Sequence, residues 1–205
     1  MKIKKNTVLT IDQYINEALY NNKFGYYMKN NPFGKNGDYI TSPNISILFS
    51  EMIAIWIISF WENLKYPKKF NLIELGGGNG EMIKQILNTF KNFPLFQNCC
   101  KIHILEKSTY LKNIQKQNLK NKNIKWLKNL NEISNRPNIF IANEFFDSLP
   151  IKQFIKKEQK WYERNIKFSK INKPEFLNIL TNIKKFEKKI GFNISYKQKF
   201  IEYSP

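Results

Sequence analysis

The sequence predicts an α/β fold built around a parallel sheet, and two patterns support this prediction. First, short apolar strands alternate with helical stretches, which is typical of βαβ units and of the parallel sheets that they form. The strands are expected at residues 70–75, 101–106, 123–127 and 138–142, with helices at 81–90 and 108–119. Second, glycines, acids or amides follow three of these strands, and ligands of open α/β sheets bind at the carboxyl ends of the strands.

Other elements are expected before and after this sheet in the sequence. Thr10 or Asp12 caps a predicted helix over residues 10–20, whose apolar side chains share one face. Residues 21–46 are rich in Gly, Pro and Asn and predict an irregular loop, which its five aromatic side chains should keep packed. The other expected elements are a helix over 45–64, an antiparallel hairpin from strands 151–156 and 160–168, and a helix over 174–190.

The charge of the chain is strongly positive, yet it does not predict a nucleic-acid partner. Of 34 basic residues only Arg136 and Arg164 are arginines, the side chain preferred for bidentate contacts with phosphate and guanine. Lys, Asn and Ile are abundant together, as expected from an AT-rich genome. We therefore interpret the net charge of +18 as codon bias spread over solvated surfaces.

Several classes of site are disfavoured by the residues present. Cys99 and Cys100 are adjacent, so they form neither a disulfide framework nor the ligand spacing of a metal site, and no metal is expected. His103 lies in an apolar run and is interpreted as a strand residue rather than a catalyst. The apolar stretch at 52–61 is too short to span a bilayer, and no signal peptide is expected. These features predict a cytoplasmic protein of a bacterium.

A glycine-rich stretch follows the first predicted strand and opens a helix, which is the position of a nucleotide-binding turn. It reads Glu74-Leu75-Gly76-Gly77-Gly78-Asn79-Gly80. A dinucleotide fingerprint needs a glycine where this chain has Glu81, whose carboxylate would lie near a pyrophosphate. The pattern instead suits a cofactor without phosphates that carries a sulfonium cation and an amino acid tail. Taken alone, it could also be a structural turn after a buried strand.

Acids and an amide follow two other predicted strands. Glu106 ends the second strand, where an acid in doubly wound folds binds a ribose diol, although exposed acids are also common at strand ends. Asn143, Glu144 and Asp147 follow the fourth strand beside two phenylalanines. They predict a set that orients a substrate, or alternatively a helix cap.

Together, these stretches resemble the MidA family, methyltransferases related to the mitochondrial complex I assembly protein that dimethylates an arginine. The resemblance runs from about residue 10 to the C-terminus. Its matching segments are Gly25-Tyr26-Tyr27, Pro32-Phe33-Gly34, Gly37-Asp38-Tyr39-Ile40-Thr41-Ser42-Pro43, Glu74 to Gly80, Asn143 to Pro150 and Trp161-Tyr162-Glu163-Arg164. The chain departs from the family pattern at Gly77 and Asn79, commonly proline and arginine, at Asn44, commonly an acid, and at Ser50, commonly a glycine.

The resemblance implies a Rossmann-like class I methyltransferase sheet that uses S-adenosyl-L-methionine. The implied cofactor-binding residues are Glu74, Gly76, Gly77, Gly78, Gly80, Glu106, Thr41 and Pro43. Asn143, Glu144 and Asp147 are the implied catalytic residues, and the implied acceptor is an arginine of a protein substrate, such as a complex I subunit. The implied segments are an N-terminal helical and loop extension (1–65), a cofactor-binding core (66–150), and a substrate-side hairpin and helix (151–205).

The resemblance also implies that the sheet is incomplete, because the family's chains continue beyond the equivalent of Pro205 and such sheets have seven strands. This expectation leaves three functions open. The chain could be an active methyltransferase, a non-catalytic assembly or binding protein that keeps part of the fold, or, on its charge alone, an RNA methyltransferase.

Overall fold

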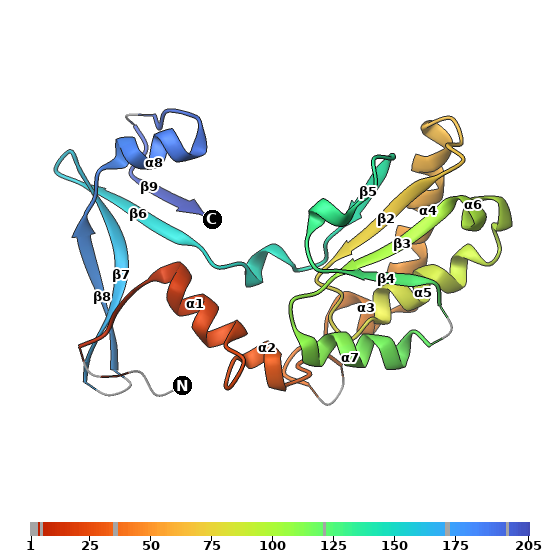
Figure 1. The fold of residues 1–205 in the computed structure, drawn as a ribbon, viewed down its shortest axis with the longest axis horizontal. Coiled ribbons are helices and arrows are strands. Elements are labelled where there is room, and N and C mark those ends of the chain that lie inside the picture. The colour runs from red at the N-terminus through yellow and green to blue at the C-terminus, as the bar shows by residue number, and fades with distance from the viewer. Residues whose placement is uncertain (1–3, 5, 35–36, 121, 171–172, 196) are drawn as a thin grey trace. The chain divides into compact units, whose positions relative to one another are not determined.

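A computed structural model describes residues 4, 6–34, 37–120, 122–170, 173–195 and 197–205, and these form two compact units (Figure 1). One unit comprises residues 26–147, and the other joins residues 1–25 to residues 148–205. These units differ from the three predicted segments, 1–65, 66–150 and 151–205. The reason is that β1 (Val8–Thr10) pairs with the distant strand β7 (Lys160–Lys170), which ties the N-terminus to the C-terminal part.

The unit of residues 26–147 contains the predicted parallel sheet (Figure 1). Its strands are β2 (Phe70–Leu75), β3 (Cys100–Leu105), β4 (Ile124–Leu127) and β5 (Asn138–Ile141), in the order β4-β3-β2-β5. Every pairing is parallel, so the predicted fold class is confirmed. Glu74 lies opposite both Ile104 and Ile141, so β2, β3 and β5 end at one edge of the sheet.

Helices cover one face of this sheet through alternate strand residues. The helices of the unit are α2 (Tyr26–Lys29), α3 (Ser42–Ile45), α4 (Ile47–Asn63), α5 (Glu81–Phe90), α6 (Pro94–Cys99) and α7 (Thr109–Asn118), with 3-10 turns η1 (Leu130–Glu132) and η2 (Phe146–Ser148) near β5. Side chains of α4 and α5, such as Ile57 and Ile86, pack with Leu72, Ile104 and Ile139 in one core. These contacts bury one face of the sheet, whereas Phe140, on the opposite face of β5, is exposed.

Helix α4 is apolar on nearly all sides, yet only part of it is buried. Ala54, Ile57 and Trp61 enter the core. The exposed large apolar side chains of the helix are Ile47, Leu48, Met52, Ile55, Trp56 and Phe60, and we call this set the α4 apolar face. None of the helices in the described residues has the length and apolarity needed to cross a membrane.

Helix α7 begins at a buried cap. Ser108 Oγ accepts the backbone N–H of Leu111 at 3.0 Å and donates to the carbonyl of Tyr27. Ser108→Ala removes both hydrogen bonds of this buried cap. We expect it to lower the free energy of unfolding by about 2 kcal/mol. Urea unfolding of this variant beside Thr109→Ala, a change at the exposed next residue, checks the value. Equal midpoints for the two variants would contradict the role of the cap.

The other unit is an antiparallel sheet with two helices, one after its first strand and one before its last strand in sequence. It comprises β1, α1 (Ile11–Tyr20), β6 (Lys152–Lys157), β7, β8 (Lys173–Leu180), α8 (Ile183–Ile190) and β9 (Phe200–Tyr203). Strands follow the order β1-β7-β6-β9, and β8 also pairs with β7. The β6–β7 hairpin confirms the predicted hairpin of 151–156 and 160–168.

The predicted helix over 174–190 is wrong in its first half, where β8 pairs antiparallel with β7. Pro174 is compatible with this strand because β8 lies at an edge of the sheet, where a missing N–H is tolerated. The helix starts only at Ile183, since Asn182 caps it by accepting the N–H of Lys184 at 3.1 Å.

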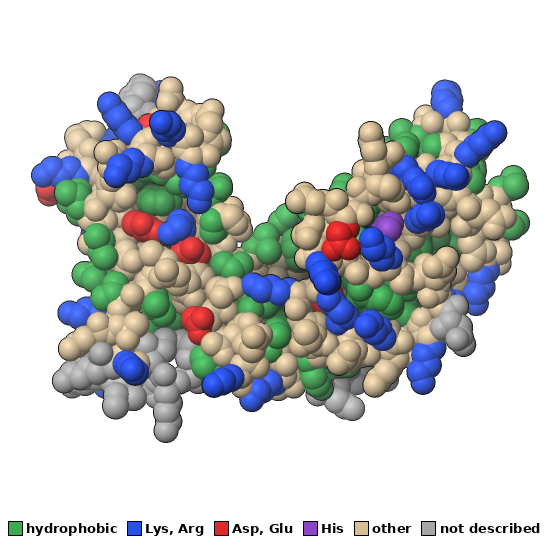
Figure 2. Space-filling model, viewed as in Figure 1, with side chains coloured by type: hydrophobic (Ala, Val, Ile, Leu, Met, Phe, Trp, Pro, Cys, Tyr) green, Lys and Arg blue, Asp and Glu red, His purple; other side chains and the backbone are tan. Residues whose placement is uncertain are grey.

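Lysine and arginine side chains lie over the visible surface of both units rather than on a single element (Figure 2). His103 lies in β3 and its Nε2 is 3.1 Å from Asn71 Oδ1, which confirms its interpretation as a strand residue. Cys99 and Cys100 are free thiols.

Candidate functional site

The glycine-rich stretch forms a tight loop between β2 and α5. Gly76, Gly78 and Gly80 have φ of +70°, +52° and +85°, a left-handed conformation that favours glycine. The Gly76 N–H donates to the Leu105 carbonyl at 2.9 Å, and the Gly80 N–H donates to the Gly77 carbonyl at 2.8 Å. The predicted position between a strand and a helix is therefore confirmed.

Two aromatic rings lie against this loop. A Cβ atom on Gly76 would lie 2.6 Å from the ring of Phe145, so that a side chain here would force the ring to move. A Cβ on Gly78 would lie 3.5 Å from the ring of Phe33, which stacks on Tyr27. Because Gly76 and Gly78 have no side chains, the rings of Phe145 and Phe33 can approach the backbone of the loop.

Glu106 follows β3 and is held by hydrogen bonds on both carboxylate oxygens. Its Oε1 accepts the Ser108 N–H at 2.8 Å, and its Oε2 accepts Gln115 Nε2 at 3.2 Å. The side chain is 9% exposed, and burial raises its pKa although these hydrogen bonds lower it in part. Each oxygen keeps further acceptor capacity, so the carboxylate can receive donors from a ligand.

Glu74 is the most unusual acid of the site. It is 2% exposed at the end of β2, and burial, with the nearby charge of Glu106, raises its pKa to about 8. Its Oε2 is buried without a hydrogen-bond partner among the described residues. A buried acceptor without a donor costs free energy, and such groups occur at functional sites.

Thr41 caps α3, in which Pro43 is buried, and Thr41 is linked to the glycine loop through two asparagines. Asn44 Nδ2 donates to Thr41 Oγ1 at 3.0 Å, and Asn79 Nδ2 donates to Asn44 Oδ1, also at 3.0 Å. Asn44 and Asn79 are two of the positions at which the chain departs from the MidA pattern, and they contact each other.

The Asn44–Asn79 hydrogen bond predicts a coupling between these positions. We expect Asn44→Ala to cost about 1 kcal/mol, and Asn79→Ala somewhat more, because Asn79 Oδ1 also accepts the Glu81 N–H at 3.1 Å. The double variant should be less destabilised than the sum of the two by about 0.5–1 kcal/mol. Urea unfolding of the four proteins measures this difference, and strict additivity would show that the contact carries no energy.

The residues after β5 lie at the same edge of the sheet. Asn143 is half-buried, whereas Glu144 and Asp147 are exposed. The backbone of Glu144 has φ +50°, which is uncommon for a residue with a side chain and frequent at functional turns. The register of β2, β3 and β5 therefore brings the turn after β5 to the edge that carries the glycine loop and Glu106.

Sequence reasoning missed three residues that contact the predicted set. Phe145 lies against Gly76, Asn79 links the loop to Asn44, and Gln115 of α7 donates to Glu106. Only Gln115 left a detectable signal, a polar residue on the apolar stripe that Leu111 and Leu119 form. No group of three or more His, Cys, Asp or Glu side chains among the described residues is placed to hold a metal ion.

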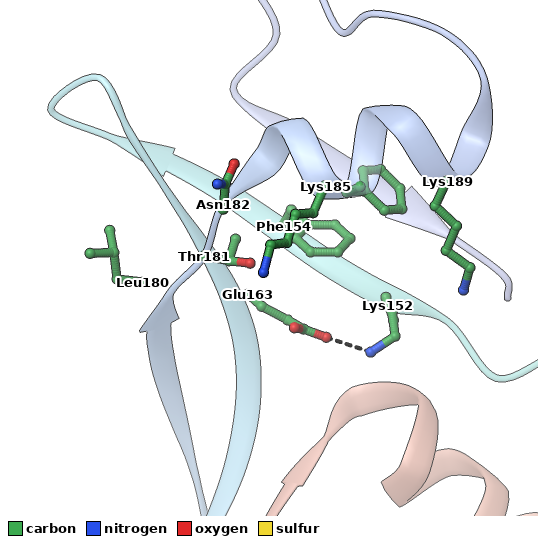
Figure 3. A pocket seen from close by; sticks show the side chains of 9 residues that line it. Lys152, Phe154, Glu163, Leu180, Thr181, Asn182, Lys185 and Lys189 are labelled. Atoms are coloured by element: carbon green, nitrogen blue, oxygen red, sulfur yellow. Dashed lines mark hydrogen bonds and ion pairs between the residues drawn. The ribbon is translucent and has the colours of Figure 1, made fainter.

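The other unit contains a separate open pocket of about 380 Å³ (Figure 3). Phe154 and Phe186 line it, and Lys185 and Lys189 come from α8. Lys152 pairs with Glu163 at 2.6 Å and with Asp12 at 3.3 Å. None of the residues predicted as cofactor-binding or catalytic lines this pocket.

Comparisons with known proteins identify the family of the chain. Residues 52–205 match the family described as "Putative S-adenosyl-L-methionine-dependent methyltransferase". The chain therefore belongs to this family of methyltransferases, and the resemblance to MidA proteins is confirmed. S-adenosyl-L-methionine is the cofactor in the description of the family.

The particular relatives are named protein arginine methyltransferase NDUFAF7, mitochondrial. The Xenopus laevis protein is 35% identical over 186 residues, which cover 79% of this chain and 43% of the relative. The Homo sapiens protein is 33% identical over 186 residues, covering 79% and 42%. The chain thus spans less than half the length of these curated relatives.

Two crystal structures of proteins from Burkholderia thailandensis share the fold. One, bound to S-adenosyl-homocysteine, gives a TM-score of 0.75 at 19% identity and covers 96% of this chain and 52% of that chain. The other, a native structure, gives a TM-score of 0.71 at 19% identity, with 96% and 50% covered. These likenesses support the Rossmann-like methyltransferase fold.

Proposed function

We propose that this chain binds S-adenosyl-L-methionine at the glycine loop and forms the cofactor-binding part of a methyltransferase that acts on a protein arginine. The observation that carries the proposal is the buried, unpartnered Oε2 of Glu74 beside that loop. Membership of a methyltransferase family supports the reaction. Because the chain spans under half of its curated relatives, the activity of the whole protein is part of the proposal.

The residues present fit this cofactor better than a phosphate-bearing one. Glu81 occupies the first position of α5, and its carboxylate accepts from Lys84 and Gln85 there, where a dinucleotide would need room for a pyrophosphate. Glu74 has an acceptor atom free for a cationic donor. A ligand with an amino group and a sulfonium, and without phosphates, matches both features.

The cofactor-side roles follow from these contacts. S-adenosyl-L-methionine, when bound, supplies a methyl group that is already activated on sulfur. Glu106, with both oxygens oriented by hydrogen bonds, is proposed to accept the ribose hydroxyls. Glu74 is proposed to face the cationic amino and sulfonium end of the cofactor. Gly76, Gly77, Gly78 and Gly80 allow close approach of the backbone, and Thr41 and Pro43 are proposed to border the same site.

The acceptor-side roles are proposed for the turn after β5. The carboxylates of Glu144 and Asp147 would accept hydrogen bonds from a guanidinium, and Asn143 would help to orient it. One carboxylate would take the proton that the acceptor nitrogen loses when it is methylated. The names of the relatives support arginine as the acceptor. A complex I subunit as substrate rests on the MidA resemblance.

Calorimetric titration of the purified chain with S-adenosyl-L-methionine tests the proposal. We expect saturable binding, and Glu106→Ala should weaken it about 10- to 100-fold, because a hydrogen bond to a charged group is worth roughly 1.5–3 kcal/mol. Glu175→Ala, which removes an exposed acid from β8 in the other unit, is the matched control and should bind like the wild type. No heat of binding at millimolar cofactor would reject the proposed function.

A further inference from the structure

Gln115 is a fully buried polar side chain in the middle of α7. It is 0% exposed and lies one helical turn from Leu111 and Leu119, which are also buried. A polar group in such a place is costly unless every donor and acceptor is satisfied. The contacts of Gln115 therefore indicate why it is present.

Gln115 makes three hydrogen bonds to three different segments around the candidate site. Its Nε2 donates to the carbonyl of Gly78 at 2.9 Å and to Glu106 Oε2 at 3.2 Å. Its Oε1 accepts the indole N–H of Trp126 on β4 at 2.8 Å. One side chain thus joins the glycine loop, the acid after β3 and the neighbouring strand.

The orientation of this amide is fixed by the chemistry of its partners. An indole N–H only donates, so the amide oxygen must face Trp126. A carbonyl and a carboxylate only accept, so the amide nitrogen must face Gly78 and Glu106. Glutamate in place of Gln115 would present no donor to them, and methionine would satisfy none of the three. To make all three hydrogen bonds, a side chain of this length must donate twice and accept once, as glutamine does.

The glycine loop makes room for this side chain. A Cβ on Gly77 would lie 3.1 Å from Gln115 Nε2, and one on Gly80 would lie 3.5 Å from Gln115 Cα. Gly77 and Gly80, which lie before and after Gly78, are therefore both in contact with α7 where the amide reaches the Gly78 carbonyl. The glycine loop and Gln115 therefore pack directly against each other.

We propose that Gln115 is a positioning residue that holds the Glu106 carboxylate and the glycine loop in the geometry that binds the ribose of the cofactor. This inference rests on the proposed function. It gives Gln115 an effect on the ribose hydroxyls, which Glu106 is proposed to bind, in addition to its hold on the glycine loop. A merely structural role would weaken all ligands alike, whereas a positioning role would weaken most the ligands that carry the full ribose diol.

Calorimetry with S-adenosyl-homocysteine and its analogue lacking the ribose 2′-hydroxyl separates these roles. In the wild type we expect the analogue to bind about tenfold more weakly, the value of one charge-assisted hydrogen bond. Gln115→Met keeps the size of the side chain but loses its hydrogen bonds. It should bind S-adenosyl-homocysteine about tenfold more weakly than the wild type, and the preference over the analogue should fall to about threefold or less.

Gln117→Met, an equal change at an exposed position two residues away, is the control and should keep the wild-type affinity and preference. If Gln115→Met keeps the full preference for the 2′-hydroxyl, the positioning role is overturned while the proposed function stands. If the wild type itself binds neither ligand, the proposed function fails, and the positioning role fails with it.

Trp126→Phe provides a second variant in case Gln115→Met does not fold. It leaves Gln115 in place but removes the donor that fixes the amide orientation. We expect a smaller reduction of the 2′-hydroxyl preference, about two- to threefold. An unchanged preference in this variant would likewise count against the positioning role.

Discussion

Glu74→Gln is expected to make the protein more stable at alkaline pH and at the same time weaken its binding of the cofactor. In the folded chain burial raises the pKa of Glu74 to about 8, whereas an exposed glutamate has a pKa near 4.5. Between these values the folded state holds a proton that the unfolded state has lost. The free energy of unfolding therefore falls as the pH rises from about 4.5 to 8, by about 5 kcal/mol from this group.

Glutamine has nearly the same shape and cannot ionise, so this part of the pH dependence should vanish in the variant. Urea unfolding at several values between pH 5 and pH 9 measures it. Burial raises the pKa of Glu106 too, which acts in the same direction, so the difference between the wild-type and variant curves isolates Glu74. Glu51→Gln, at an exposed position of α4, is the control. Parallel curves for the wild type and Glu74→Gln would refute the buried, protonated state.

The same variant should bind S-adenosyl-L-methionine about tenfold or more weakly, because it removes the negative charge proposed to face the cation. In the wild type, affinity should rise with pH as Glu74 of the free protein ionises. In Glu74→Gln this rise should be lost. Gain of stability with loss of affinity would identify Glu74 as a group kept for binding at a cost in stability.

Gly76→Ala is the second change with a large expected effect. The backbone there has φ +70°, and the new Cβ would lie 2.6 Å from the ring of Phe145. The strained conformation costs about 1 kcal/mol and the overpacking about 1–3 kcal/mol, so the free energy of unfolding should fall by about 2–4 kcal/mol. Cofactor affinity should fall at least tenfold, because ring and loop must both shift.

Gly191→Ala is the matched control for the strain alone. Its φ is +78°, and apart from its chain neighbours no described residue has an atom within 4 Å of the new Cβ. It should cost only about 1 kcal/mol and leave cofactor binding unchanged. Adding Phe145→Ala to Gly76→Ala should remove the steric part of the cost. A Gly76 variant no less stable than the Gly191 variant would disprove the tight contact with Phe145.

The sequence predicted the sheet well where local patterns and packing agree. The bounds of β2 and α5 match the prediction, because an apolar run stopped by glycines and a one-sided helix are unambiguous. It failed at β8, where apolar residues are spaced too irregularly to separate strand from helix. Pairing with the distant strand β7 decides that segment, and no local pattern carries this information.

The candidate site was predictable to a similar extent. The strand ends alone suffice to bring the glycine loop, Glu106 and the residues after β5 to one edge, since parallel strands in register end together. The contacts around them were not predictable. Phe145 meets Gly76 through a turn whose shape no propensity fixes. The departures at Asn44 and Asn79 seemed unrelated until the structure placed them in contact.

Two opposing forces act between molecules of this chain in solution: repulsion between their net positive charges and attraction between their α4 apolar faces. A net charge of +18 keeps the molecules apart at low ionic strength, because like charges repel over about 10–30 Å when little salt is present. Salt shortens this range to about 8 Å at physiological strength, while the attraction between exposed Leu48, Met52 and Trp56 side chains remains. Added salt should therefore bring the molecules together, the reverse of its usual effect on proteins held by ion pairs.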